Sequence, residues 1–197
     1  VPVLYSPFIS FPLSKKRHSG FLLPFVGSQG ESGTVISAPY YLNLAENFDL
    51  TFKPTSFSGR GLMLEGEFRH KSNYSESVLE LANMEKDDVY GKSRHAYSVR
   101  DNRIYTNTLK QNNAKWEGTL IRSNLNAGGI SDLSYFDDFG NTVSRIGRTH
   151  ITRNFLLEKI DYGDFGYFKS SIGATDFQLA KTGLNEQYSI FPRIRVD

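Results

Sequence analysis

The chain has 197 residues, a formal net charge of +2, no cysteine and 14% aromatic residues. The lack of cysteine excludes disulfides, zinc–thiolate sites and thiol nucleophiles from this sequence. The small net charge gives no reason to expect a nucleic acid partner, and the one basic run, "KKRH" at 15–18, is short enough to be a solvated turn. No stretch approaches about 18 consecutive apolar residues, so no transmembrane helix is predicted.

Alternation of apolar and polar residues dominates the chain, and it indicates β-strands rather than helices. The clearest case is "FDLTFKPT" at 48–55, where Phe48, Leu50 and Phe52 share one face. In chain order we expect strands near residues 20–27, 34–44, 48–55, 61–70, 76–84, 93–102, 115–126, 150–161, 166–177 and 192–197. The sequence therefore predicts an all-β, antiparallel fold with about nine strands and the start of a tenth.

The lengths of the strands and of their connections favour an outer-membrane β-barrel. Most of the expected strands have the length of about 9–11 residues that crosses a bilayer at a tilt. Connections are short after the second, fourth and eighth strands and long after the fifth, seventh and ninth, which is the barrel pattern. The polar connection "TNTLKQNNA" at 106–114 is the exception. We expect residues 19–197 to form the N-terminal part of a large barrel, present here as an open set of strands.

One face of the expected sheet is charged. It carries Asp49, Lys53, Glu65, Glu67 and Arg69. A charge at the bilayer midplane costs about 2–4 kcal/mol, so this face must meet water, and the opposite face must meet lipid or a protein core. A charged inner face suits a wide, water-filled lumen better than the narrow interior of a small barrel.

The sequence predicts no catalytic, cofactor or metal site. Its histidines do not have the spacing of metal ligands, and they are His18, His70, His95 and His150. Neither a GxSxG motif nor a P-loop is present. The acidic pairs at 87–88 and 137–138 are expected to lie in solvated loops.

Several motifs closely resemble the LptD family, the lipopolysaccharide-assembly proteins of the Gram-negative outer membrane, also called organic solvent tolerance proteins. These motifs are "RHSGFLLP", "PYYLNLAENFDLTFKP" and "SGRGLMLEGEFR", and weaker similarity continues through "ISDLSYFDDFGN" and "FPRIRVD". The resemblance is strongest over 5–70. It implies that residues 1–18 link a preceding periplasmic jelly-roll domain to a barrel of roughly 26 strands.

The resemblance also implies a function and partners. The family moves lipopolysaccharide out sideways between the first and last barrel strands. Its partners are the plug lipoprotein LptE inside the barrel and periplasmic bridge proteins that contact the jelly roll. We expect the polar face and the 127–148 loop, with Tyr135, Phe136 and Asp138, to contact the plug lipoprotein.

Prolines occur in each of the first three expected strands, as Pro24, Pro39 and Pro54. Proline gives no N–H to a ladder, and a central strand normally excludes it. Pro24 and Pro39 match the seam prolines of the family by position, so the resemblance implies a lateral gate with Phe21, Pro24, Pro39 and Tyr41. For Pro54 we expect ordinary placement near a strand end.

Two other functions fit part of the pattern. A general diffusion porin shares the two-faced sheet, but it needs no prolines at its first seam. A small outer-membrane barrel enzyme would need a catalytic dyad or triad at the rim, which the sequence does not provide.

Overall fold

The computed structural model describes residues 17–112, 115–140, 142–144, 146–163 and 166–197. Almost all of them lie in strands. The elements are β1 (Gly20–Phe21), β2 (Phe25–Gln29), the 3₁₀ turn η1 (Gly30–Ser32), β3 (Gly33–Ser37), β4 (Tyr40–Ala45), β5 (Phe48–Phe57), β6 (Gly61–Lys71), β7 (Ser75–Met84), β8 (Arg94–Asn112), β9 (Lys115–Ile130), α1 (Tyr135–Phe139), β10 (His150–Gly163), β11 (Gly166–Leu179) and β12 (Ile190–Val196).

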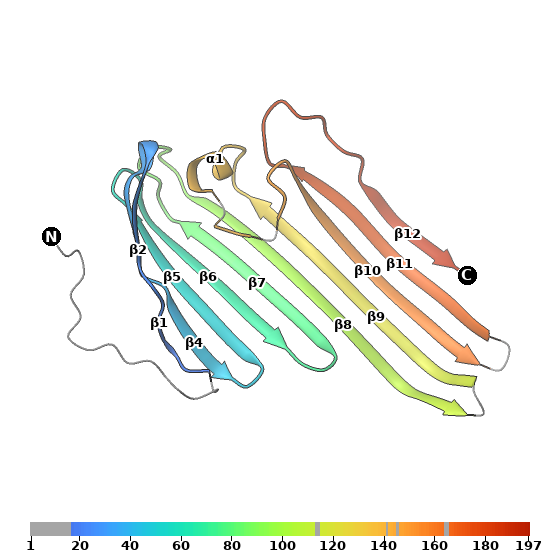
Figure 1. Ribbon diagram of the computed structural model, residues 1–197. Helices are drawn as coiled ribbons and strands as arrows, with labels where there is room; N and C mark the ends of the chain where they lie inside the picture. The colour runs from blue at the N-terminus through green and yellow to red at the C-terminus, as the bar shows by residue number, and fades with distance from the viewer. Residues whose placement is uncertain (1–16, 113–114, 141, 145, 164–165) are drawn as a thin grey trace.

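The strands form one antiparallel, 12-stranded sheet, which confirms the predicted all-β class (Figure 1). Its order is β1-β4-β5-β6-β7-β8-β9-β10-β11-β12, and the β2–β3 hairpin joins it through β3 and β5. There are more strands than the alternation predicted, because the first two expected strands are each broken. The breaks lie at 22–24 and 38–39, next to Pro24 and Pro39.

The long connections all lie at one end of the sheet. Figure 1 shows the connections 85–93, 131–149 and 180–189 at the upper end, together with the short turns 30–32 and 58–60, whereas the turns 46–47 and 72–74 lie at the lower end. The apparent exception at 106–114 was a wrong prediction, because β8 runs to Asn112 and β9 starts at Lys115. The segment was misread because its sequence is mostly polar and so lacks the alternation of a half-buried strand.

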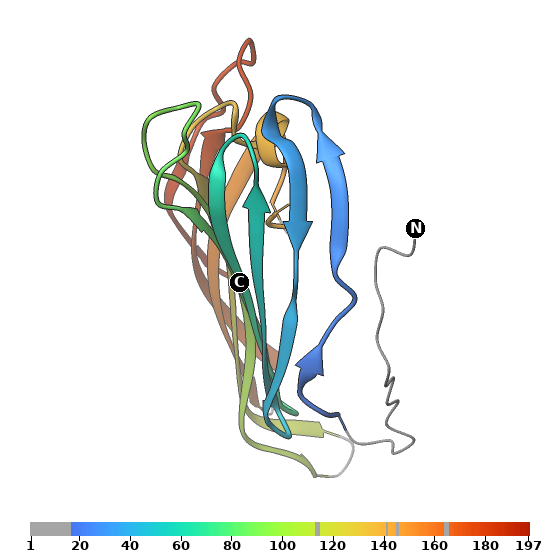
Figure 2. The ribbon, with the colours of Figure 1, turned by 90° about the vertical axis from the view of Figure 1, so that its left-hand side faces the viewer.

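The sheet is curved and open (Figure 2). In the part of the chain that the structure describes, the edge formed by β1 and β2 and the edge formed by β12 lack an outer partner. Within those residues no helix is long and apolar enough to cross a membrane. The first edge is called the seam below.

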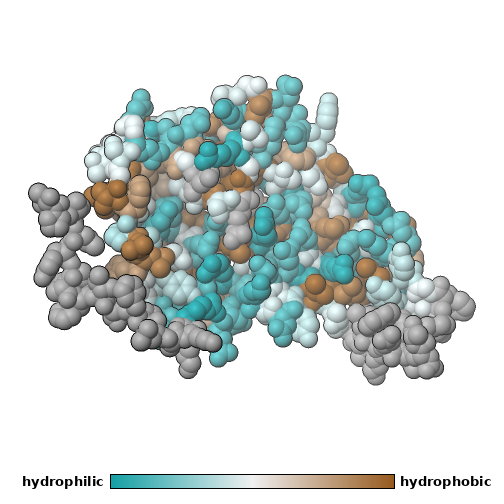
Figure 3. Space-filling view, viewed as in Figure 1, coloured by the Kyte–Doolittle hydropathy of each residue, from teal (hydrophilic) through white to brown (hydrophobic). Residues whose placement is uncertain are grey.

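The two faces of the sheet differ as the alternation predicted. Asp49 pairs in register with Arg69, and Lys53 pairs with Glu65, so their side chains share one face, called the polar face. The opposite, apolar face exposes large side chains, among them Phe52, Leu62, Leu64 and Leu81. The face turned to the viewer in Figure 3 is largely hydrophilic across its middle.

The hydrophobic core is small and lies at the upper end of the polar face. Here the connection 131–149, called the cap, folds onto the sheet. Tyr135 and Phe139 of α1 are buried with Met63 and Met84, which have the same orientation as the polar-face residues of β6 and β7. The cap therefore covers the upper part of the face that would line the inside of a closed barrel.

Candidate functional site

The three prolines lie at one level across the first strands. Phe21 pairs with Tyr40 and Phe25 with Ser37, so the break at 22–24 faces the break at 38–39. On the next strand, the residues of β5 up to Phe52 pair with β4, and those from 55 onward pair with β3. Residues 53–54 therefore face the second break. The three prolines, each without a backbone N–H donor, thus lie in one line across the strands, called the proline line.

The missing donors of two prolines face toward the seam. The backbone N–H of Leu22 donates to the carbonyl of Pro39 at 2.9 Å, and that of Ala38 donates to the carbonyl of Pro54 at 3.3 Å. Because N and O of one strand residue point to the same side, the absent N–H groups also face these neighbours. β5 continues to Phe57, so Pro54 lies three residues before the end of its strand rather than one before the expected end at residue 55.

Below the proline line the seam is lightly paired. β1 contributes only two residue pairs, Gly20 with Tyr41 and Phe21 with Tyr40. The ring of Phe21 is 78% exposed and meets Tyr40 edge to face at 4.9 Å. Phe21 and Tyr41 therefore lie in neighbouring residue pairs of the seam but on opposite faces of the sheet, since the Tyr41 hydroxyl donates to Asp49 on the polar face at 3.2 Å. Pro39 directly precedes Tyr40 in the second break, and Pro24 lies above them in the break of the first strand.

The charges predicted for the polar face are paired with one another. Arg69 donates to both carboxylate oxygens of Asp49, at 2.7 and 3.0 Å, and Arg17 adds a third bond at 2.8 Å. Lys53 lies 2.8 Å from Glu65. Asp49 and Glu65 are buried beneath these partners, while Glu67 and Arg69 remain partly exposed. The face offers a neutralised, hydrogen-bonding surface rather than a charged patch.

The guanidinium of Arg60 is buried between three segments. Arg60 closes the turn between β5 and β6, and its side chain is 2% exposed. Its Nε donates to the Ser32 hydroxyl at 2.9 Å, and its two terminal nitrogens donate to Asp87 at 2.9 Å and to Asp138 at 2.7 Å. One side chain thus ties η1, the 85–93 connection and the cap together.

Arg94, at the start of β8, completes the cluster and is fully buried. It donates to both oxygens of Asp132, at 2.9 and 2.7 Å, to Asp87 at 3.1 Å, and also to Asp138. Its guanidinium stacks 4.6 Å from the centre of the Phe139 ring. We call Arg60, Asp87, Arg94, Asp132 and Asp138 the arginine–aspartate network.

The two arginines keep the acidic partners ionised. Burial alone would raise the pKa of Asp87, but hydrogen bonds from Arg94, the Val89 N–H and Arg60 hold it below its ordinary value. The pKa of Asp132 is likewise lowered, because the bonds from Arg94 and Ser131 outweigh burial. In contrast, burial raises the pKa of the Tyr135 hydroxyl to about 12.

The network differs from the sequence expectation for the acidic pairs. Asp87 is fully buried and Asp138 accepts from both arginines, so only Asp88 and Asp137 fit the predicted solvated loops. Nothing in the local sequence joins residues 60, 87, 94 and 132. The available signal was an arginine beside a turn glycine in "SGRG", combined with acidic residues in the connections at the same end of the sheet.

The three residues predicted to contact a partner lie within the cap. Tyr135 is fully buried and Phe136 is 6% exposed, both against this chain's own sheet. Asp138 belongs to the network. Exposed neighbours such as Leu133 and Asp137 lie on the outer surface of the cap and are accessible to another molecule.

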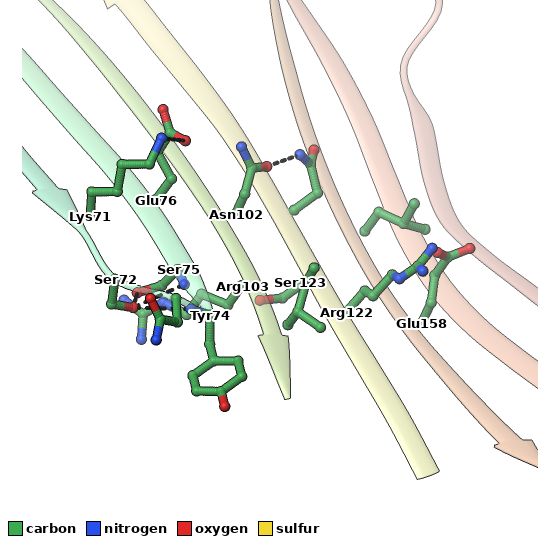
Figure 4. A pocket seen from close by; sticks show the side chains of 14 residues that line it. Lys71, Ser72, Tyr74, Ser75, Glu76, Asn102, Arg103, Arg122, Ser123 and Glu158 are labelled. Atoms are coloured by element: carbon green, nitrogen blue, oxygen red, sulfur yellow. Dashed lines mark hydrogen bonds and ion pairs between the residues drawn. The ribbon is translucent and has the colours of Figure 1, made fainter. Parts of the chain in front are cut away.

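A groove of about 460 Å³ lies lower on the polar face (Figure 4). The amide of Asn124 donates to that of Asn102, and Lys71 pairs with Glu76 at 3.2 Å. Among the described residues no group of three His, Asp or Glu side chains stands close enough to hold a metal ion. The groove offers amide and charged groups suited to hydrogen bonding with polar groups.

The chain has the architecture of an outer-membrane β-barrel segment. Its antiparallel strands are long, its sheet has one apolar and one polar face, and its long connections lie at a single end. The family model described as LptD protein matches residues 1–142, and the chain belongs to this family.

Proteins that align with this chain over its full length are also named as LptD proteins. The chain is 34% identical over 202 residues to an "LPS-assembly protein LptD" of Sodalis glossinidius, and 33% identical over 203 residues to one of Pseudomonas aeruginosa strain UCBPP-PA14. Both alignments cover 100% of this chain, but 24% and 20% of the relatives. A third relative of that name, from Chromobacterium violaceum, is 35% identical over 158 residues, covering 80% of this chain and 18% of the relative. The chain thus spans about a quarter or less of these proteins.

Proposed function

We propose that the chain is the N-terminal part of an outer-membrane barrel that assembles lipopolysaccharide into the outer leaflet, and that the seam is one side of its lateral gate. The names of the relatives, LPS-assembly proteins, support lipopolysaccharide as the substrate class. The observation that carries the gate is the line of three prolines across β1 to β5. A closed barrel resists opening because every strand edge is paired, and absent donors at one level weaken that pairing.

The two faces of the sheet then have separate roles. The apolar face meets lipid, and the polar face, with Asp49, Lys53, Glu65, Glu67 and Arg69, lines the lumen. We propose that the plug lipoprotein LptE contacts this face below the cap and the outer surface of the cap itself. Residues 1–18 would lead to the periplasmic jelly roll that receives lipopolysaccharide from the bridge proteins; residues 1–16 lie outside the described part of the chain.

A site-specific photocrosslinker in the full-length protein tests the gate. Placed at Phe21 or Tyr41, it is expected to capture lipopolysaccharide in living cells, because both positions border the seam. Tyr188, which is 92% exposed in the 180–189 connection, is the matched control. Equal capture at Tyr188 and at the seam, or capture at neither seam position, would refute the gate.

A further inference from the structure

The upper and lower halves of the seam differ in how many contacts attach them to the rest of the sheet. The lower half is β1, with two residue pairs. The upper half is the hairpin 25–37, called the seam hairpin, in which β2 and β3 form five residue pairs. Figure 2 shows the chain bending between β1 and β2, at the level of Pro24.

The tip of the seam hairpin is fastened to the rest of the sheet. Ser32 accepts from Arg60, and the side-chain amide of Gln29 donates to the backbone carbonyl of Asp138 at 2.8 Å. The backbone N–H of Gly59 donates to the carbonyl of Ser32 at 3.1 Å. A Cβ on Gly59 would lie 2.8 Å from the carbonyl of Glu31, so the turn and the tip are in close contact.

Burial separates this anchor from the contacts of the lower half. Arg60 and Arg94 are 2% and 0% exposed and reach two long connections at once. The corresponding ion pair below, Arg17 with Asp49, has an arginine that is 49% exposed. Water competes with exposed ion pairs far more effectively than with buried ones, so the ion pairs of the upper half are better shielded from water than the pair below.

We propose that Arg60 and Arg94 are positioning residues that hold the seam hairpin still, so that the seam opens only below the proline line. The arginine–aspartate network holds α1 in place. In turn, α1 and Arg60 hold the tip of the seam hairpin. The breaks at 22–24 and 38–39 then act as the hinge. This inference rests on the proposed function, because it assigns a fixed and a moving half to the proposed gate.

Paired spin labels in the full-length protein in membranes measure the two halves separately. Val26 and Leu62 lie in one row across β2, β3, β5 and β6, and both are exposed. Phe21 and Gly66 lie in one row across β1, β4, β5 and β6, and a side chain at Gly66 meets nothing within 4 Å. Residues 1–197 contribute no further cysteine that would compete for the labels. We expect a narrow distance distribution for the upper pair and a broad one for the lower pair.

Two variants test the role of the network. Arg60→Gln is expected to broaden the upper distribution to the width of the lower one. The double variant Gln29→Ala/Ser32→Ala removes only the side-chain bonds of the tip, and the same broadening is expected with the barrel fully assembled. Lys86→Gln removes one positive charge from an exposed ion pair with Asp88 in the 85–93 connection and should change neither pair.

The outcomes separate this inference from the proposed function. Equal widths for the two pairs in the unmodified protein, or a narrow upper pair in both variants, would overturn the inference. Lipopolysaccharide capture at Phe21 together with a broad distance distribution for the upper pair would agree with the proposed gate. It would refute the proposal that the seam hairpin is held still. Absence of lipopolysaccharide capture at both Phe21 and Tyr41 refutes the proposed gate, whatever distances the spin labels report.

Discussion

Arg94 and Asp132, 38 residues apart, meet through two hydrogen bonds of 2.9 and 2.7 Å in a buried, fork-like pair. The pair joins the first residue of β8 to the start of the cap. The network as a whole has one more carboxylate than guanidinium group. Backbone donors compensate for this excess, since Asp87 also accepts from the N–H groups of Val89 and Tyr90.

Removal of Arg94 should therefore release the cap. Arg94→Ala leaves Asp132 without a guanidinium partner and leaves Asp87 and Asp138 with Arg60 alone, and breaking a buried pair in this way costs roughly 3–5 kcal/mol. We expect faster amide hydrogen exchange in residues 131–139 and a lower melting temperature of the barrel. Lys86→Ala, in an exposed pair, should cost at most about 1 kcal/mol. Unchanged exchange in the Arg94 variant would contradict the structural role of the network.

The fold and its two faces could be predicted because alternation is a local property. Lys53 and Glu65 were assigned to one face before their pairing was known, and the register confirms it. The network could not be predicted, because its residues come from different connections that only the complete sheet brings together. A charged residue in a loop has the same local pattern whether it is solvated, as Asp88 is, or buried, as Asp87 is.

The proline line is an intermediate case. The three prolines are equally spaced in the sequence, and alignment follows once the turns at 30–32 and 46–47 fix the registers. The sequence showed the prolines in consecutive strands, but turn positions were not assigned to single residues. As a result the sequence indicated weakened pairing at Pro24 and Pro39 but missed that Pro54 belongs to the same line.

Acid should loosen the cap only well below neutral pH. Asp87 and Asp132 have folded-state pKa values below the ordinary 3.8. Their stabilising contribution is therefore complete above about pH 4 and is lost as the pH falls through the lowered values. Hydrogen exchange of residues 131–139, corrected for its intrinsic pH dependence, should be constant from neutral pH to about pH 5. Loosening already at pH 6 would show that other groups control the cap.

The plug lipoprotein should be captured from the polar face alone. A photocrosslinker at Glu67, which is partly exposed on that face, is expected to capture LptE in the full-length complex. Leu64 is 44% exposed on the apolar face and should give only lipid products. At Tyr135, which is buried, the crosslinker should react mainly within the chain. Capture of LptE at Leu64 and not at Glu67 would reverse the assignment of the faces.

Restoring the missing donors should tighten the gate. In Pro24→Ala/Pro39→Ala each change supplies an N–H, and the one at residue 39 faces the first strand. One ladder bond contributes about 0.5–1.5 kcal/mol, so two could lower the open population roughly tenfold. Barrel assembly should stay normal, while delivery of lipopolysaccharide to the cell surface slows and sensitivity to large antibiotics rises. Pro192→Ala, in β12 at the opposite edge, controls for loss of proline itself. Unchanged delivery by the double variant at normal protein levels would mean that these prolines only interrupt the strands and do not weaken a gate.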